Sequence, residues 1–169
     1  VFDLTAAGMS RANSLDLPPE AEEMRTQIRA EARRIAELDE KAQLDELIAT
    51  GYVMPHWPKP WGRGAGAVEQ LLVEEEFAAA GVKRPDYGIT GWVILTLIQH
   101  GTPWQIERFV EKALRKDEIW CQLFSEPSAG SDAAAVKTRA TRVDGGWMIT
   151  GQKVWTSGAH YCKRGLATV

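Results

Sequence analysis

The segment EIWCQLFSEPSAGSD, residues 118–132, separates two kinds of sequence in this chain. Before it, apolar residues recur every three or four positions, which is the period of an amphipathic helix. From Glu118 onward, β-branched and aromatic residues replace that period, as is typical of strands. The change predicts a domain boundary: residues 1–117 form a helical domain, and residues 118–169 form the beginning of a β domain.

Three helices are predicted in the first half of the helical domain. The first lies within residues 16–40 and opens with prolines and acidic residues, which suit a first helical turn. The second ends at Gly51, and the third runs from about Ala67 to Gly81. The run Glu74–Glu76 in the third helix is interpreted as a solvated helix face.

Two more helices follow. The segment GITGWVILTLIQHG, residues 88–101, is apolar nearly all round, which predicts a helix buried in the middle of a bundle. The next helix begins at Thr102, where Gln105 three positions on completes a capping box. The loop between the second and third helices, residues 51–66, holds two tryptophans and is expected to be ordered. It either lines a binding site or plugs the bundle.

The residues after the boundary predict a small sheet. Strands are expected at residues 118–125 and 135–143, then a hairpin turn at 144–146, then a strand at 147–157. The final segment, GLATV, has no visible partner, and so small a sheet with an open edge is incomplete. The predicted fold class is α+β: an N-terminal all-α helical bundle followed by a truncated antiparallel β domain.

Composition excludes several functions. The 169 residues carry a net charge of -3 with scattered basic residues, so nothing calls for nucleic acid. Cys121 and Cys162 lack the spacing and histidine partners of a zinc site, and reduced thiols are expected. The longest apolar run, GWVILTLI, is too short to span a bilayer, and the N-terminus does not resemble a signal peptide. We expect a cytoplasmic protein without a metal site.

The SEPSAGSD turn combines hydroxyls, a glycine and backbone N–H groups, which suit phosphate or carbonyl oxygens. Glu126 could pin the turn through backbone hydrogen bonds, and Asp132 could cap the segment that follows. Such a turn is structural in most proteins. A serine hydrolase is excluded, because no GxSxG elbow exists and His160 lies in another segment.

Trp155 and Ser157 are alternate residues of the predicted last strand and would therefore share one face. A flat π surface beside a hydrogen-bond donor suits a planar heteroaromatic cofactor. A tryptophan in the core is the commoner use of such a residue, and both interpretations stay open at this point.

Four motifs together resemble the acyl-CoA dehydrogenase family of flavoproteins: CQLFSEPSAGSD, GQKVWTSGAH, GYVMPHWPKPWGRGAG and LLVEEEFAAAG. The resemblance runs from about residue 20 to the end and covers the family's N-terminal helical domain and the start of its middle β domain. Phe124 stands where the family usually has an aliphatic residue, and Ser128 where glycine is common. Phe124 bears on the packing against the flavin.

The resemblance implies an FAD site. Ser125 would lie near the pyrimidine edge of the flavin, Trp155 would cover the ring face away from the substrate, and Ser157 would hydrogen-bond near N5. Ser131, beside Gly130, would approach the diphosphate and the thioester, which makes it the implied substrate contact. The implied cofactor residues are Gln122, Leu123, Phe124, Ser125, Gly130, Ser131, Trp155, Thr156 and Ser157.

The family removes the substrate α-proton with a Glu from a C-terminal helical domain, which the 169 residues do not contain. Loss of a general base costs about 10²- to 10⁴-fold in rate, so no catalytic residue is assigned in this chain and the isolated chain is expected to be inactive. Glu126 is an improbable substitute base, because in the motif it belongs to the turn. The implied partners are an acyl-CoA substrate and electron-transfer flavoprotein as acceptor, in a homo- or hetero-oligomer such as a dimer or homotetramer.

Three functions follow from the resemblance. The first is the N-terminal portion of an FAD-dependent acyl-CoA dehydrogenase of fatty acid and lipid metabolism, which desaturates the α,β bond of an acyl-CoA thioester with hydride transfer to FAD. The second is a non-catalytic partner subunit or interaction module of a heteromeric enzyme. The third is an acyl-CoA oxidase or a related flavin monooxygenase.

Overall fold

The computed structural model describes residues 19–169, and these divide into two compact units, one ending at Pro85 and one beginning at Asp86. The start of the first predicted helix, residues 16–18, lies outside the described residues. Among the residues that the structure describes, five helices precede residue 118 and strands follow it, so the predicted fold class α+β is confirmed. No helix of the described residues is long and apolar enough to cross a membrane.

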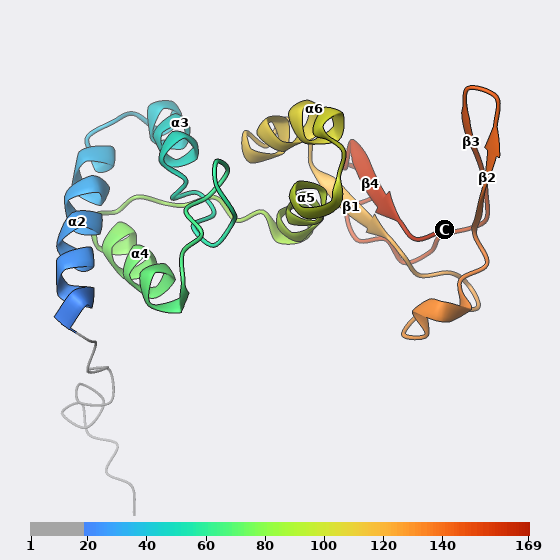
Figure 1. The fold of residues 1–169 in the computed structure, drawn as a ribbon, viewed down its shortest axis with the longest axis horizontal. Coiled ribbons are helices and arrows are strands. Elements are labelled where there is room, and N and C mark those ends of the chain that lie inside the picture. Colours follow the sequence, from blue (N-terminus) through green and yellow to red (C-terminus); the bar gives the residue numbers. More distant parts are fainter. Residues whose placement is uncertain (1–18) are drawn as a thin grey trace, which may run out of the picture. The chain divides into compact units, whose positions relative to one another are not determined.

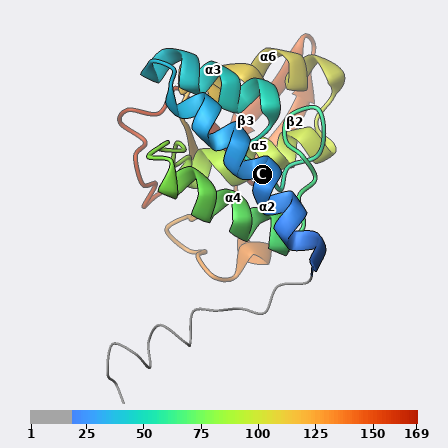
Figure 2. The same cartoon turned by 90° about the vertical axis from the view of Figure 1, so that its left-hand side faces the viewer.

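The first unit contains α2 (Pro19–Ala36), α3 (Glu40–Thr50) and α4 (Ala67–Ala79), and its core lies where α2 packs against α4. Figures 1 and 2 show these two helices side by side. Asp39 caps α3 by accepting a hydrogen bond from the amide of Ala42 at 2.9 Å, and Gly51 ends it in the left-handed conformation. The helices thus begin and end where local sequence chemistry requires.

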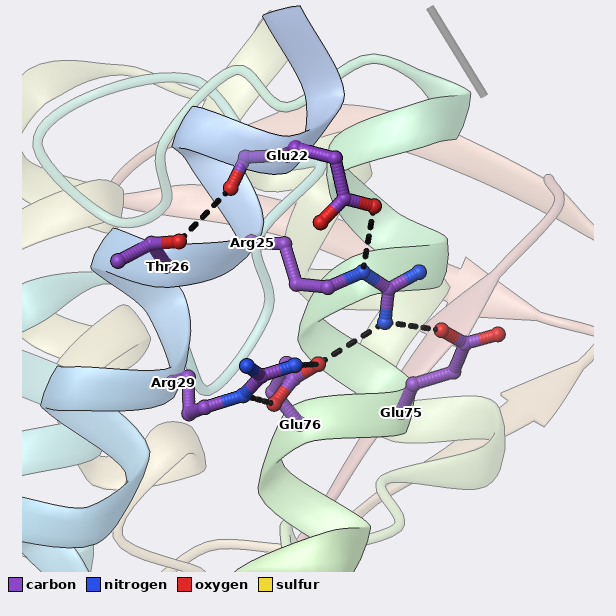
Figure 3. A network of polar contacts seen from close by, with 6 residues as sticks. All are labelled: Glu22, Arg25, Thr26, Arg29, Glu75 and Glu76. Atoms are coloured by element: carbon purple, nitrogen blue, oxygen red, sulfur yellow. Dashed lines mark hydrogen bonds and ion pairs between the residues drawn. The ribbon is translucent and has the colours of Figure 1, made fainter. Parts of the chain in front are cut away.

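An ion network joins α2 to α4 and corrects the interpretation of residues 74–76 as a solvated face (Figure 3). Glu76 is buried, and its carboxylate accepts from Arg25 at 2.9 Å and from Arg29 at 2.7 and 3.0 Å. Glu74 and Glu75 are exposed, as expected of such a face. Glu76 is buried because it lies on the side of α4 that meets α2, where two arginines neutralise it.

The loop of residues 51–66 packs into the first unit. Trp57 is buried, and the guanidinium of Arg63 lies 4.2 Å above the ring of Tyr52. A side chain on Gly62 would approach the carbonyl oxygens of Met54 and Trp57 to 2.5 Å, so the chain passes too close there for any residue larger than glycine. Of the two roles open for this loop, the burial of Trp57 favours that of a plug.

The second unit packs two helices against a pair of strands. Helix α5 (Gly88–His100) contacts α6 (Pro103–Leu114) and β1 (Trp120–Leu123), and the Thr102–Gln105 capping box opens α6 as predicted. The hydroxyl of Thr90 accepts from the amide of Trp120 at 3.0 Å. Helix α5 is not buried all round, because Trp92 stays partly exposed. Because α5 packs on β1, this helix belongs to the same compact unit as the strands. The domain boundary that the sequence places near residue 118 stays a prediction.

The strands form two separate pairs. Strand β1 pairs in parallel with β4 (Arg164–Ala167), so the expectation that the last segment lacks a partner was wrong. Strands β2 (Arg139–Val143) and β3 (Gly146–Thr150) form the predicted antiparallel hairpin, and a short 3₁₀ turn, η1 (Ala133–Ala135), precedes them.

The predicted strand over residues 147–157 ends early, at Thr150. A side chain on Gly151 would meet the hydroxyl oxygen of Thr138 at 2.2 Å, so the chain passes close to Thr138 directly after β3. Residues 151–156 have no regular secondary structure, so Trp155 and Ser157 are not alternate residues of a strand.

Candidate functional site

The second unit contains a hollow of about 140 Å³ formed by two segments and the first turn of α5. Its lining residues are Ile89, Gln122, Phe124, Ser125, Val154, Trp155 and Ser157. Pockets that enclose a small ligand usually measure about 300–1,000 Å³. The hollow is therefore too small to enclose such a ligand by itself.

The first wall of the hollow continues from β1. Gln122 lies within β1, and Phe124 and Ser125 follow directly after the strand ends. The ring of Phe124 packs edge-on against Trp92 of α5, with 5.7 Å between ring centroids. Phe124 is therefore supported from behind by a second aromatic side chain, which keeps its ring at the hollow.

The second wall is built by residues 154–157, where the backbone of Trp155 takes an unusual conformation. Trp155 has φ of 60°, a region that bulky residues rarely adopt, and its side chain is 90% exposed. Strained residues of this kind concentrate at functional sites. The exposed indole offers a flat aromatic surface beside the hydroxyl of Ser157.

Glu126 holds the turn that follows the first wall. Its carboxylate accepts from the amide of Lys137 at 2.6 Å, from the amide and hydroxyl of Thr138 at 3.0 and 2.6 Å, and from Nζ of Lys153 at 2.8 Å. Hydrogen bonds from these donors, above all the one from Lys153, lower the pKa of Glu126 to about 2. The prediction that Glu126 pins the turn is confirmed, and a carboxylate with so low a pKa is a poor proton acceptor.

The structure brings together five of the nine residues predicted to hold a cofactor: Gln122, Phe124, Ser125, Trp155 and Ser157 line the same hollow. Leu123, Gly130, Ser131 and Thr156 are not among its lining residues. Gly130 and Ser131 are exposed, and a side chain on Gly130 would meet no atom of the chain within 4 Å. Space therefore exists beside Gly130 for another molecule.

Sequence reasoning missed two lining residues. Val154 directly precedes Trp155, so the motif itself could have indicated it. Ile89 lies in α5, where the apolar pattern indicated burial but gave no sign of which residue would reach the hollow.

Other candidate residues carry no site. Asp132 precedes η1, but its side chain makes no capping hydrogen bond, which corrects that expectation. Cys121 and Cys162 are free thiols, as predicted. Within residues 19–169, no group of three or more His, Cys, Asp or Glu side chains could hold a metal ion.

Comparisons with known proteins agree in pointing to one family. The family model "Acyl-CoA dehydrogenase, N-terminal domain" matches residues 18–117, and "Acyl-CoA dehydrogenase, middle domain" matches residues 121–169. Among curated relatives, the acyl-CoA dehydrogenase FadE34 of Mycobacterium tuberculosis is 51% identical over 166 residues, which are 98% of this chain and 23% of that protein.

Two solved structures share the fold. The ChsE4-ChsE5 complex from Mycobacterium tuberculosis superposes with a TM-score of 0.62 at 27% identity, covering 92% of this chain and 44% of that one. The Tcur3481-Tcur3483 steroid ACAD gives a TM-score of 0.54 at 29% identity, covering 86% and 42%. The chain thus spans less than half the length of each of these relatives.

Proposed function

Because this chain belongs to the acyl-CoA dehydrogenase family, as its motifs predicted, we propose that it forms part of the FAD site of a flavin-dependent acyl-CoA dehydrogenase. In such an enzyme, FAD supplies the oxidant that accepts a hydride from the β-carbon of an acyl-CoA thioester. This chain would contribute one side of the flavin site. The general base would come from outside it, since none of the residues that line the hollow is a carboxylate.

The observation that carries this proposal is the convergence of two segments on one hollow. Phe124 and Ser125 follow β1, whereas Trp155 and Ser157 lie beyond the hairpin, and all four border the same space. The residue types fit a flavin: an exposed indole for the ring face, and hydroxyls for the polar edge of the ring.

Seven of the nine implied cofactor residues have a proposed role. Trp155 covers one face of the ring, Ser157 donates a hydrogen bond near the reacting nitrogen, and Ser125 binds the pyrimidine edge. Ser131, with Gly130, contacts the diphosphate and the thioester; both are exposed, and the space beside Gly130 is open. Leu123 and Thr156 complete the site through their backbones.

A second function, that of a partner subunit, is favoured by one specific observation. Of the similar solved structures, one is the complex of ChsE4 with ChsE5, and another, the Tcur3481-Tcur3483 steroid ACAD, carries the names of two proteins. A chain in such a heteromer could complete a neighbour's site without reacting itself. The Tcur3481-Tcur3483 structure is that of a steroid ACAD, so a bulky acyl-CoA with a steroid-like acyl group is the substrate class to test first.

Uptake of FAD separates these functions. The purified chain, alone and with candidate partner chains, is dialysed against FAD, and bound flavin is measured by its visible absorbance. Retained flavin that Ser157→Ala and Ser125→Ala release more readily supports the proposal. A chain that takes up no FAD in any combination contradicts it. Flavin-loaded protein is then assayed with an artificial electron acceptor, with electron-transfer flavoprotein and for oxygen consumption, which distinguishes a dehydrogenase from an oxidase.

A further inference from the structure

Lys153 directly precedes the second wall of the hollow, and its ammonium bonds to the first wall. Its ammonium donates to the carbonyl of Phe124 at 3.0 Å, to Oε1 of Glu126 at 2.8 Å and to the hydroxyl of Thr168 at 3.2 Å. An ammonium group has three N–H donors, so all of them are used. The side chain is only 11% exposed, and these contacts are therefore made largely out of water.

The acceptors of Lys153 belong to the first wall, to the turn that follows it and to the end of β4, whereas Lys153 itself directly precedes the second wall. Phe124 lines the hollow, Glu126 holds the turn beside it, and Thr168 follows β4 directly. The chain then continues from Lys153 into Val154 and Trp155, which line the opposite side. One buried cation thus connects the two segments that form the hollow.

Trp155 needs such an anchor, because its own side chain cannot hold it. A side chain that is 90% exposed makes few packing contacts, and φ of 60° is unfavourable for tryptophan. A strained conformation persists only where the surroundings impose it. Directly before Trp155, the amide of Val154 donates to the carbonyl of Ser125 at 2.9 Å, and Lys153 makes its three bonds.

Lys153 is not the only donor that holds the turn. The amides of Lys137 and Thr138 and the hydroxyl of Thr138 already give Glu126 three short hydrogen bonds from one neighbouring segment. What Lys153 adds is the connection from this turn to residues 154–157. Its contribution is therefore specific to the spacing of the two walls.

We propose that Lys153 is a positioning residue whose ammonium sets the separation of the two walls of the hollow and keeps Trp155 at its rim. The proposal rests on the proposed function only where it takes the hollow to be a flavin site. The hydrogen bonds on which it rests all lie within this chain, so it can be tested without a ligand.

The test uses ¹⁹F NMR of the chain labelled with 5-fluorotryptophan, with resonances assigned through single Trp→Phe substitutions. In Lys153→Met we expect the Trp155 resonance to move and broaden, while the resonance of Trp120, buried on β1, stays in place. Glu126→Gln removes the charge but keeps an acceptor, and it should displace the Trp155 resonance in the same direction.

The matched control is Lys163→Met. Lys163 also donates to a backbone carbonyl, that of Asp117 at 2.8 Å, but it is exposed and does not line the hollow. It should leave the Trp155 resonance unchanged. A Trp155 resonance that does not move in Lys153→Met overturns the proposal. The proposal is also overturned if the Trp155 and Trp120 resonances move together in both Lys153→Met and Glu126→Gln, because Lys153 would then support the whole unit. Neither result depends on whether FAD binds.

Discussion

The backbone amide of Val154 donates a hydrogen bond to the carbonyl oxygen of Ser125 across 2.9 Å. This bond joins two segments that the hairpin of β2 and β3 separates in the sequence, and it places an exposed indole beside the end of β1. The hollow between these segments is where the proposed flavin site lies, and the predictions below concern it and the unit before it.

Replacing Trp155 should raise the stability of the chain and weaken its binding of FAD. Left-handed backbone costs an L-residue about 1–2 kcal/mol, and asparagine tolerates it better than tryptophan. Trp155→Asn should therefore raise the free energy of unfolding by about 0.5–1 kcal/mol. Loss of the aromatic contact, worth about 0.5–1.5 kcal/mol, should weaken FAD binding about 2- to 12-fold.

Urea unfolding and FAD titration measure the two effects. Trp147→Asn is the matched control, because Trp147 is exposed on β3 and has ordinary strand geometry. It should lower stability, since asparagine suits strands poorly, and leave FAD affinity unchanged. A Trp155→Asn chain that is less stable than the wild type would show that the backbone at Trp155 is unstrained.

The ion network of Figure 3 should stabilise the first unit, and Glu76→Gln tests this. Hydrogen bonds to charged groups contribute about 1.5–3 kcal/mol. Because the side chain of Arg29 is 45% exposed, water can partly replace its bonds, and we expect a loss of about 1–2 kcal/mol in the free energy of unfolding. Hydrogen bonds from Arg29 above all, and from Arg25, lower the pKa of Glu76. This contribution is therefore present above the carboxyl's ordinary pKa and is lost as pH falls through the lowered one.

Glu74→Gln is the control for the ion network. Glu74 is exposed and pairs with Arg84 at the surface, where such pairs contribute less than about 1 kcal/mol. Equal losses for the two substitutions, measured by urea unfolding, would mean that the burial of Glu76 adds nothing.

Much of the helical half could be predicted because its signals are local. The Thr102–Gln105 capping box and the helix end at Gly51 each depend on residues within one turn, and both are present. Glu76 was misjudged because three consecutive glutamates give no sign of which one faces α2. Its arginine partners lie far away in the sequence.

The β half was predicted less completely, because its decisive contacts are distant in sequence. The parallel pairing of β1 with β4 joins segments about forty residues apart, and no turn signals it. The conformation of Trp155 could not be predicted either, since alternation of side chains presumes a strand, and β3 ends at Thr150. The motifs CQLFSEPSAGSD and GQKVWTSGAH nevertheless located five of the residues that line the hollow.

The carboxylate of Glu126 should make stability depend on pH. Its pKa falls from an ordinary 4.5 to about 2 in the folded chain, chiefly through Lys153. A carboxyl whose pKa is lower in the folded than in the unfolded chain stabilises the folded state at pH values above the unfolded pKa. This contribution should therefore be complete above about pH 5 and disappear as pH falls from there toward 2. Unfolding of the wild type and of Glu126→Gln, measured across that range, should give a difference that shrinks with falling pH. A constant difference would contradict the assigned pKa.

The close passage of the loop at Gly62 predicts a large effect for a single methyl group. A Cβ at Gly62 would meet two carbonyl oxygens at 2.5 Å, so Gly62→Ala should cost about 3 kcal/mol. Gly66→Ala is the control, because no atom lies within 4 Å of its added Cβ, and as a helix N-cap change it should cost about 1 kcal/mol or less. Chemical denaturation of both variants checks this, and a Gly62→Ala chain as stable as Gly66→Ala would rule out the tight passage.

The most direct test of the flavin site is an FAD titration of the 5-fluorotryptophan-labelled chain, followed by ¹⁹F NMR. Trp104 and Trp147 are the internal controls, because both are exposed but neither lines the hollow, and both would respond to non-specific stacking. If the two segments bind the flavin, the Trp155 resonance shifts saturably while those of Trp104 and Trp147 stay in place. A Trp155 resonance that is unchanged at saturating FAD, or that moves only together with the two controls, would contradict the site.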